Sequence, residues 1–249
     1  MPLHLRMAFW TPKREGRRER DWTSVVQEFE MVPAPELAER LREHYDLGSG
    51  DLAPIHELTR AGQPQVVAFD QFNARTGPLG RVTTWRTGVV IRSQEAHTQV
   101  SLRASAKRHA VLEGLEAGRS GAQRLDCPED PTFNDAISVY ARESAGALPL
   151  LTAPVRTVLM RLLVSADQVL ASSARGARER IPRQATGVAP SVVIGPRSLF
   201  LALEAETPFP LESTATAIVD MLSLHAALMA ATGRHASRQR ARNELDHSR

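Results

Sequence analysis

The chain has 249 residues, of which 42% are hydrophobic and 24% are charged, and both values are ordinary for a globular protein. Its single cysteine, Cys127, excludes an intramolecular disulfide, and no N-terminal stretch has the build of a secretory signal. The sequence therefore predicts a compact cytoplasmic protein that is large enough to bury a core of its own.

Positive charge is concentrated at the two ends of the chain. Residues 1–20 hold six basic and two acidic side chains and residues 234–249 hold five and two, whereas the whole chain carries only +3. The body between them is therefore acidic. Because charged, Pro- and Gly-containing ends cannot contribute to a core, we expect a mobile basic arm over 1–20, a domain over 21–233 and a solvated basic tail over 234–249.

The first half of the chain is typical of a helix followed by hairpins. Residues 21–31 fit either a strand or a short helix, and the apolar spacing over 36–47 predicts a helix that stops near Gly48. After a short irregular segment, strands over 65–73 and 81–92 pair through the turn at 76–80. A third candidate strand over 97–103 completes an antiparallel meander, and 104–116 fits a short helix.

The second half repeats this pattern loosely. Strands are expected over 123–126 and 133–141, a helix from Leu150, a loop over 171–187 and a hairpin over 191–194 and 198–206. The apolar stretch 211–232 predicts a helix ending at Gly233. The longest weakly polar run within it, 214–231, contains Asp220 and His225 and falls short of the roughly 20 apolar residues that a membrane span needs, so we expect a buried core helix and no membrane-spanning segment.

These elements predict an α+β fold in which antiparallel hairpins form a meander and the helices 36–47, 150–165 and 211–232 pack on one side. A hairpin followed by a helix occurs twice. Two arrangements therefore stay open: a single domain over 21–233, or two pseudo-equivalent halves over 21–118 and 122–233.

The order of these elements resembles a known family from Trp22 to about Ala231. The resemblance is carried by Trp22, the hairpin 66–70 to 89–91, the turn 130–134 and the hairpin 191–194 before the final helix. In these features the chain resembles an uncharacterised bacterial α+β domain family, often found behind N-terminal membrane anchors and without an assigned activity. A short basic arm stands here where relatives often have transmembrane helices. The resemblance implies a fold but no functional residue or cofactor.

No motif for a metal, a cofactor or a nucleophile is recognisable in the sequence. The histidines lack the one-turn spacing of helical zinc ligands, and the formal G-x-G-x-x-A match over 48–53 has a helix before it instead of a strand. Cys127 precedes Pro128 in an acidic turn, which would raise its thiol pKa. We therefore predict no metal site, no cofactor and no activated thiol.

Carboxylates are the remaining candidates for acid and base roles. Glu204 and Glu206 share one face of a strand, and three further acids cluster on a turn: Asp126, Glu129 and Asp130. Solvated charges explain both sets without chemistry. We therefore predict no catalytic residue.

Asp220 and His225 lie in the apolar helix 211–232, where an unpartnered polar group would be costly. Five residues apart, they point in different directions. We expect each to form a buried hydrogen bond to another element.

The preferred interpretation is a non-catalytic interaction or regulatory module with an unidentified protein partner. The alternative is nucleic-acid association through the basic ends, because neutralised phosphates release counterions. The phosphate-contacting residues would then be Arg14, Arg17, Arg18, Arg20, Arg238, Arg240 and Arg242. An enzyme of unfamiliar type is the third interpretation, and it would need a pocket that contains Glu204, Glu206 or Asp70.

Overall fold

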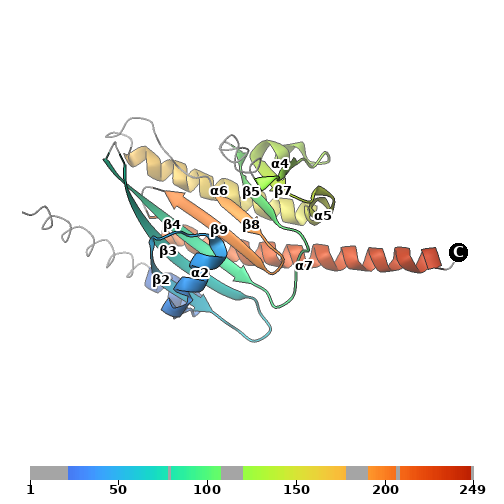
Figure 1. Ribbon diagram of the computed structural model, residues 1–249, viewed down its shortest axis with the longest axis horizontal. Helices are drawn as coiled ribbons and strands as arrows, with labels where there is room; N and C mark the ends of the chain where they lie inside the picture. Colours follow the sequence, from blue (N-terminus) through green and yellow to red (C-terminus); the bar gives the residue numbers. More distant parts are fainter. Residues whose placement is uncertain (1–21, 78–79, 108–119, 178–189, 206–207, 248–249) are drawn as a thin grey trace, which may run out of the picture.

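The computed structural model describes residues 22–77, 80–107, 120–177, 190–205 and 208–247, and over 74–83, 173–177 and 234–247 it describes the backbone alone. The described residues form one nine-stranded antiparallel sheet with helices on both faces (Figure 1). The strand order is β1-β2-β3-β4-β9-β8-β5-β7-β6. The predicted α+β fold is confirmed.

The elements have the following bounds. The strands are β1 (Val32–Pro33), β2 (Asp51–Leu58), β3 (Gln65–Gly77), β4 (Gly80–Arg92), β5 (Leu102–Ala106), β6 (Gln123–Leu125), β7 (Ile137–Ala141), β8 (Ser191–Ile194) and β9 (Ser198–Ala205). The helices are η2 (Pro35–Leu37), α2 (Ala38–Tyr45), α4 (Pro131–Ala136), α5 (Ser144–Ala147), η4 (Leu148–Leu150), α6 (Ala153–Ala177) and α7 (Leu211–His247). Residues 22–29 are also helical.

The larger core lies between one face of the sheet and the helices α6, α7 and 22–29. Alternate strand residues such as Ala68 and Val89 point to this face, because successive side chains of a strand point to opposite sides. Leu159 of α6, Met221 of α7 and Trp22 pack against them and are at most 1% exposed. We call this face of the sheet the inner face.

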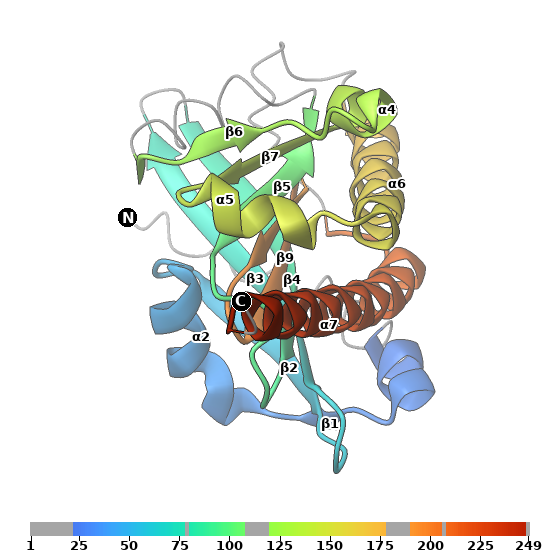
Figure 2. The ribbon, with the colours of Figure 1, turned by 90° about the vertical axis from the view of Figure 1, so that its right-hand side faces the viewer.

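The smaller core lies on the opposite face, which we call the outer face. There Leu41 of α2 packs with Val67, Phe69, Val90 and Phe200. Figure 2 shows α2 and α6 on opposite sides of the sheet. The expectation that all helices pack on one side is therefore wrong for α2, and the physical reason is that β3 and β4 are apolar on both of their faces.

Gly88 of β4 is required by this smaller core. It lies opposite Phe69 in the register of β3 and β4, and a Cβ atom at Gly88 would overlap the ring of Phe69. Phe69 in turn stacks on Phe200 with ring centroids 6.3 Å apart. The missing side chain thus makes room for an aromatic stack beneath α2.

Several predicted boundaries are wrong. The segment expected to be irregular contains β2, and residues 133–136 are helical because Asp130 caps α4 and Pro131 occupies its first turn. The expected third strand lies later, at Leu102–Ala106, which overturns a helix beginning at Ala104. The rest of that predicted helix, from residue 108 on, lies outside the described residues. The predicted hairpin of β8 and β9 is confirmed.

Helix α7 is longer than predicted. It continues through Gly233 to His247, so the expectation that it ends at Gly233 is wrong, and Figure 1 shows its last turns extending past the sheet. Over Leu211–Gly233 it is long and apolar enough to cross a membrane, as is the strongly bent pair 144–150 and 153–172, but half of the α7 stretch is buried within the fold. A core helix passes the same criterion. The absence of a membrane span stays a prediction.

The position of β5 matters most for the candidate site. By sequence it belongs to the first of the two predicted halves, yet it pairs with β7 and β8 of the second. The two halves of the chain therefore share one continuous sheet. Whether they are pseudo-equivalent, and whether the ends form separate segments, stays a prediction.

Candidate functional site

A pocket lies on the outer face of the sheet, over β5, β7 and β8. Its volume is about 570 Å³, which is within the usual range for small-molecule sites. It lies on the half of the outer face that α2 does not cover. The residues that line it come from the start of β5, the end of β7, β8 and the segment before β6.

Strand register explains which side chains meet there. Arg103 of β5 pairs with Tyr140 of β7 on one side and with Val193 of β8 on the other. Paired residues of adjacent strands project from the same face, so these three side chains form one row across the sheet. Arg142 lies two residues beyond Tyr140 and also lines the pocket.

The pocket combines charge with a small apolar surface. Arg103 is half-buried and Arg142 is exposed, while Glu143 supplies one opposing carboxylate. Val193 is 38% exposed, which makes it one of the few large apolar side chains that the described surface presents to solvent. A guanidinium pair beside an apolar wall can hold an anion that carries a hydrocarbon part.

The next row of the same face consists of serines. Ser105 pairs with Ser138 and with Ser191 in the registers of β5, and all three are at most 4% exposed. The hydroxyls of Ser105 and Ser138 are buried and have no hydrogen-bond partner among the described residues. The outer face of β5, β7 and β8 is therefore polar, in contrast to the apolar outer face beneath α2.

Asp70 lies elsewhere, on the inner face beneath the helix of residues 22–29. The indole Nε1 of Trp22 donates to its carboxylate at 2.7 Å, and the Thr87 hydroxyl donates at 2.7 Å. The His56 ring lies 5.3 Å from the Trp22 ring, and burial lowers the pKa of His56 although the Asp70 charge opposes that shift. Because Asp70 is 1% exposed, this arrangement ties the helix to the sheet and offers no access to a substrate.

Glu204 is held in an ion pair. Arg86 donates to its Oε2 from Nε at 3.2 Å and from Nη2 at 2.9 Å, and it also donates to Gln71 at 3.1 Å. Gln71 donates to the Leu47 carbonyl after α2, so the network anchors the end of that helix. Glu206 lies outside the described residues, and the predicted pair of acids is therefore described only at Glu204.

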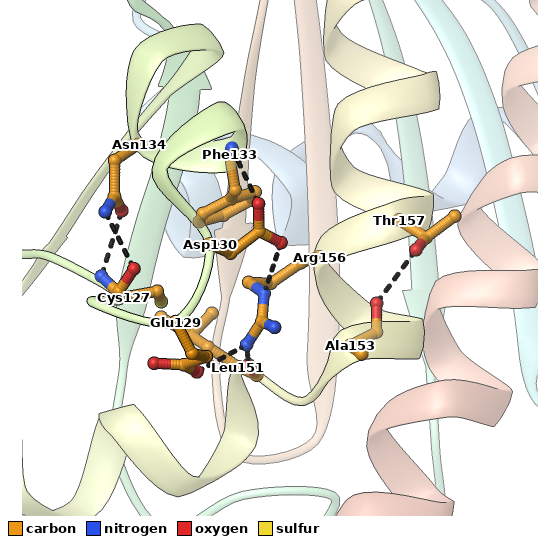
Figure 3. A network of polar contacts seen from close by, with 9 residues as sticks. All are labelled: Cys127, Glu129, Asp130, Phe133, Asn134, Leu151, Ala153, Arg156 and Thr157. Atoms are coloured by element: carbon orange, nitrogen blue, oxygen red, sulfur yellow. Dashed lines mark hydrogen bonds and ion pairs between the residues drawn. The ribbon is translucent and has the colours of Figure 1, made fainter.

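The acidic turn is organised by Arg156 of α6 (Figure 3). Its Nε donates to Asp130 at 2.9 Å, and its Nη1 donates to Glu129 at 2.8 Å and to the Leu151 carbonyl at 2.6 Å. Asp130 also caps α4 by accepting from the Phe133 amide, which is the largest cause of its lowered pKa, and the bond to Arg156 adds to it. Glu129 and Asp130 are thus brought together as a structural clamp.

Two further sequence predictions can be judged at this end of the molecule. Asp126 pairs with Arg124, at 3.3 Å, and not with the clamp. Cys127 is buried, and its burial is the largest cause of a raised thiol pKa, followed by opposing contributions of Arg156 and of the neighbouring acids. The prediction that Cys127 is not an activated thiol agrees with this direction.

Asp220 and His225 are separated, as their spacing indicated. Asp220 pairs with Arg161 of α6 at 2.6 Å, which confirms a bond to another element. His225 instead packs edge-on against His97, with ring centroids 5.6 Å apart. Burial lowers the pKa of His225, and burial together with His225 lowers the pKa of His97 to about 4.

No group of three His, Cys, Asp or Glu side chains in the part of the chain that the structure describes could hold a metal ion. The formal dinucleotide motif runs from the turn after α2 into the start of β2, with Gly48 in the left-handed region at φ 67°. A helix precedes it and a strand follows, which is the reverse of the strand and helix that hold a pyrophosphate.

The predicted phosphate-contacting arginines are not brought to the pocket by any described contact. Arg14, Arg17, Arg18 and Arg20 lie outside the described residues. The backbone at Arg238, Arg240 and Arg242 belongs to the end of α7. These positions stay predictions.

Sequence reasoning missed the residues that line the pocket. Arg103 and Tyr140 are 37 positions apart, and Val193 lies 53 beyond Tyr140, so only the strand order brings them together. One local signal was present, since Arg103 lies between the apolar residues Leu102 and Ala104. A charged residue in that position predicts a polar strand face.

Comparisons with known proteins place the fold but no function. No family model matches the chain, and no curated protein matches it. Among solved structures, the chain is similar to the crystal structure of the mycobacterial trehalose monomycolate transport factor A, TtfA, with 12% sequence identity and a TM-score of 0.50. The likeness covers 86% of this chain and 94% of that one. At this identity the similarity shows a common fold.

Proposed function

We propose that the protein is a non-catalytic interaction module that receives its partner or ligand at the pocket on the outer face of β5, β7 and β8. The observation that carries this proposal is the polar, open half of the outer face, with its pocket of about 570 Å³. The other half of the same face is closed by α2 over an apolar core.

The distribution of polar groups supports binding without chemistry. Within the described ranges, three carboxylates are held in contacts that join two elements. Asp70 accepts from a tryptophan and a threonine, and Glu204 and Asp130 each pair with an arginine. None of these carboxylates lines the pocket. A nucleophile with a hydrogen-bonded base is not formed there either, since the pocket hydroxyls have no histidine beside them among the lining residues.

The structural neighbour supports the same interpretation in a limited way. TtfA is described as a transport factor, and a fold shared with such a protein is compatible with holding a molecule without changing it. Function resides in sites and not in folds, so the proposal depends on the pocket and not on that likeness.

Site-specific photocrosslinking tests the proposal. A photoreactive amino acid at Val193 lies in the pocket, and the same group at Val219, which is 48% exposed on α7, serves as the matched control. We expect a single recurrent adduct from Val193 and none from Val219. Equal adducts at both positions, or turnover of substrates by the purified protein in a broad activity screen, would contradict the proposal.

A second candidate function is nucleic-acid association, favoured by the course of α7. Its backbone stays helical through Arg238, Arg240 and Arg242 and extends beyond the sheet (Figure 1). A projecting basic helix can follow a phosphate backbone.

This candidate predicts strongly salt-dependent binding. Replacing the three arginines with glutamine in the full chain should reduce the slope of log K against log salt by roughly 3, since each phosphate contact contributes about 0.9. Binding to duplex DNA with an unchanged slope would exclude this helix as the contact.

A further inference from the structure

The pocket is lined by two cations, Arg103 on the outer face of β5 and Arg142 directly after β7. Arg103 stands between Tyr140 and Val193 in the row across β8, β5 and β7, and Arg142 follows at the end of β7. Arginine is the side chain best suited to planar, bidentate recognition of a carboxylate or a phosphate. A tyrosine hydroxyl beside it can donate a further hydrogen bond.

The same face is also polar in the next row, which is buried. Buried hydroxyls without partners are rare because each costs free energy, yet Ser105 and Ser138 occupy two adjacent positions in the next row. On the half of the sheet beneath α2, the equivalent face is filled with valine and phenylalanine. These serines are at most 4% exposed and do not line the pocket, so the groups that can meet a ligand are those of the row of Arg103, Tyr140 and Val193.

The wall of the pocket is apolar in one part. Val193 is 38% exposed, and Ala122 and Ala141 also line the space. An exposed valine beside two arginines fits a ligand that has both an anionic head and a hydrocarbon part. The volume of about 570 Å³ suits a small molecule and is too small for a folded domain.

We infer that this pocket binds a small amphiphilic oxyanion, a carboxylate or phosphate attached to a short apolar group, with Arg103 and Arg142 holding the oxyanion and Val193 contacting the apolar part. This inference rests on the proposed function and specifies its ligand. No bond is made or broken in this step. Glu143 is the one carboxylate among the lining residues and opposes part of the positive charge of the two arginines.

Isothermal titration of the full chain tests the inference with four probes. Octyl phosphate and octanoate carry both parts of the expected ligand, inorganic phosphate carries the anion alone, and octyl glucoside carries the alkyl chain alone. We expect the two amphiphilic anions to bind more tightly than either partial probe by at least about tenfold, which is one strong interaction. If inorganic phosphate bound as tightly as octyl phosphate, the pocket would be a simple phosphate site, and the inference of an amphiphilic ligand would be wrong.

Charge-removing variants locate the site. Arg142→Gln should weaken octyl phosphate about tenfold, the loss of one charge-assisted contact, while Arg40→Gln on the exposed surface of α2 removes the same charge elsewhere and should change nothing. Arg103→Gln should weaken the binding of octyl phosphate at least as much. Thermal unfolding of the Arg103→Gln protein checks that this variant is folded. Because Arg142 is exposed, its variant remains informative if Arg103→Gln unfolds.

Three results would overturn the inference: no binding of either amphiphilic anion, equal binding of octyl glucoside, or equal loss with Arg142→Gln and Arg40→Gln. None of these three results decides the outcome of photocrosslinking at Val193, which tests the proposed function separately. A Val193 adduct without anion binding keeps the interaction module and removes the oxyanion ligand. Loss of both removes the proposed function as well.

Discussion

At the scale of single residues, the buried polar groups divide into those with partners and those without. Asp70 accepts from Trp22 and Thr87, and Arg156 satisfies two carboxylates and a carbonyl. The hydroxyls of Ser105 and Ser138 have no hydrogen-bond partner within the part of the chain that the structure describes. Because an unsatisfied buried group costs about 1–3 kcal/mol, the first set stabilises the fold and the second is retained at a cost.

Removal of the Asp70 carboxylate should destabilise the protein strongly. Asp70→Ala leaves the buried indole N–H of Trp22 and the Thr87 hydroxyl unpaired, and we expect the free energy of unfolding to fall by about 3 kcal/mol. Trp22→Phe adds a larger packing change, so Thr87→Val serves as the milder control with one donor removed. Urea unfolding measures both. An Asp70→Ala protein as stable as the wild type would show that the carboxylate is held for another purpose.

Acidification should destabilise the protein through the pair His97 and His225. In the folded protein the pKa of each ring lies below the ordinary histidine value, and that of His97 is about 4. As the pH falls, these histidines therefore bind protons in the unfolded chain before they do so in the folded protein. The stability that these neutral histidines contribute is therefore fully present above pH 6.5. It is lost progressively as the pH falls from 6.5 to about 4. For His97 alone, the free energy of unfolding should fall by about 2 kcal/mol between pH 7.5 and pH 5.

Urea unfolding at both pH values checks this expectation. In His97→Asn the difference between pH 7.5 and pH 5 should shrink by that amount, while His44→Asn on the exposed surface of α2 should leave it unchanged. An identical pH dependence in the wild type and in His97→Asn would contradict the assignment to the buried ring.

At the scale of elements, Arg156 joins the first turn of α6 to the turn before α4 (Figure 3). Its side chain is 9% exposed, whereas that of Glu129 is 62% exposed. Arg156→Ala leaves partly buried acceptors unpaired and should cost about 2–3 kcal/mol. Glu129→Ala removes only a screened contact and should cost under about 1 kcal/mol. Chemical denaturation compares the two, and equal losses would refute the clamp.

The course of α7 through Gly233 gives a prediction of opposite sign. A Cβ atom at Gly233 would meet nothing within 4 Å, and the residue lies inside the helix. Gly233→Ala should therefore stabilise the protein by roughly 0.5–1 kcal/mol, the helix propensity difference. If Gly233 instead ended the helix in a left-handed conformation, the same change would destabilise it. Thermal unfolding distinguishes the two directions.

The sequence predicted elements better than it predicted their arrangement. The hairpin of β3 and β4, the hairpin of β8 and β9 and the helices α2, α6 and α7 followed from apolar periodicity. β2 was missed because Pro54 and His56 interrupt its alternation. The position of α2 on the outer face was signalled by the consecutive apolar run of β3, since a strand buried on both faces needs cover on both.

The candidate site could not be predicted in the same way. Arg103, Tyr140 and Val193 meet only because β5 crosses to lie between β8 and β7, and such long-range strand order leaves no local pattern. Conversely, the acids that the sequence singled out are buried or paired in structural contacts where they are described.

At the scale of the whole molecule, one sheet carries two different outer surfaces. Beneath α2 it is apolar and closed, and over β5, β7 and β8 it is polar and hollowed. The inner face is covered by α6, α7 and residues 22–29, as the two ribbon views show (Figures 1 and 2). The pocket is therefore where a ligand can reach the outer face of the sheet.

Methyl NMR during a titration with octyl phosphate tests this account most directly. Val193 lies in the pocket, while Val219 lies on α7, which covers the inner face, and both side chains are partly exposed. We predict saturable shifts of the Val193 methyl signals with the Val219 signals unchanged, and their loss in Arg142→Gln. Shifts of both residues in parallel, or of Val219 alone, would contradict a binding site on the outer face of β5, β7 and β8.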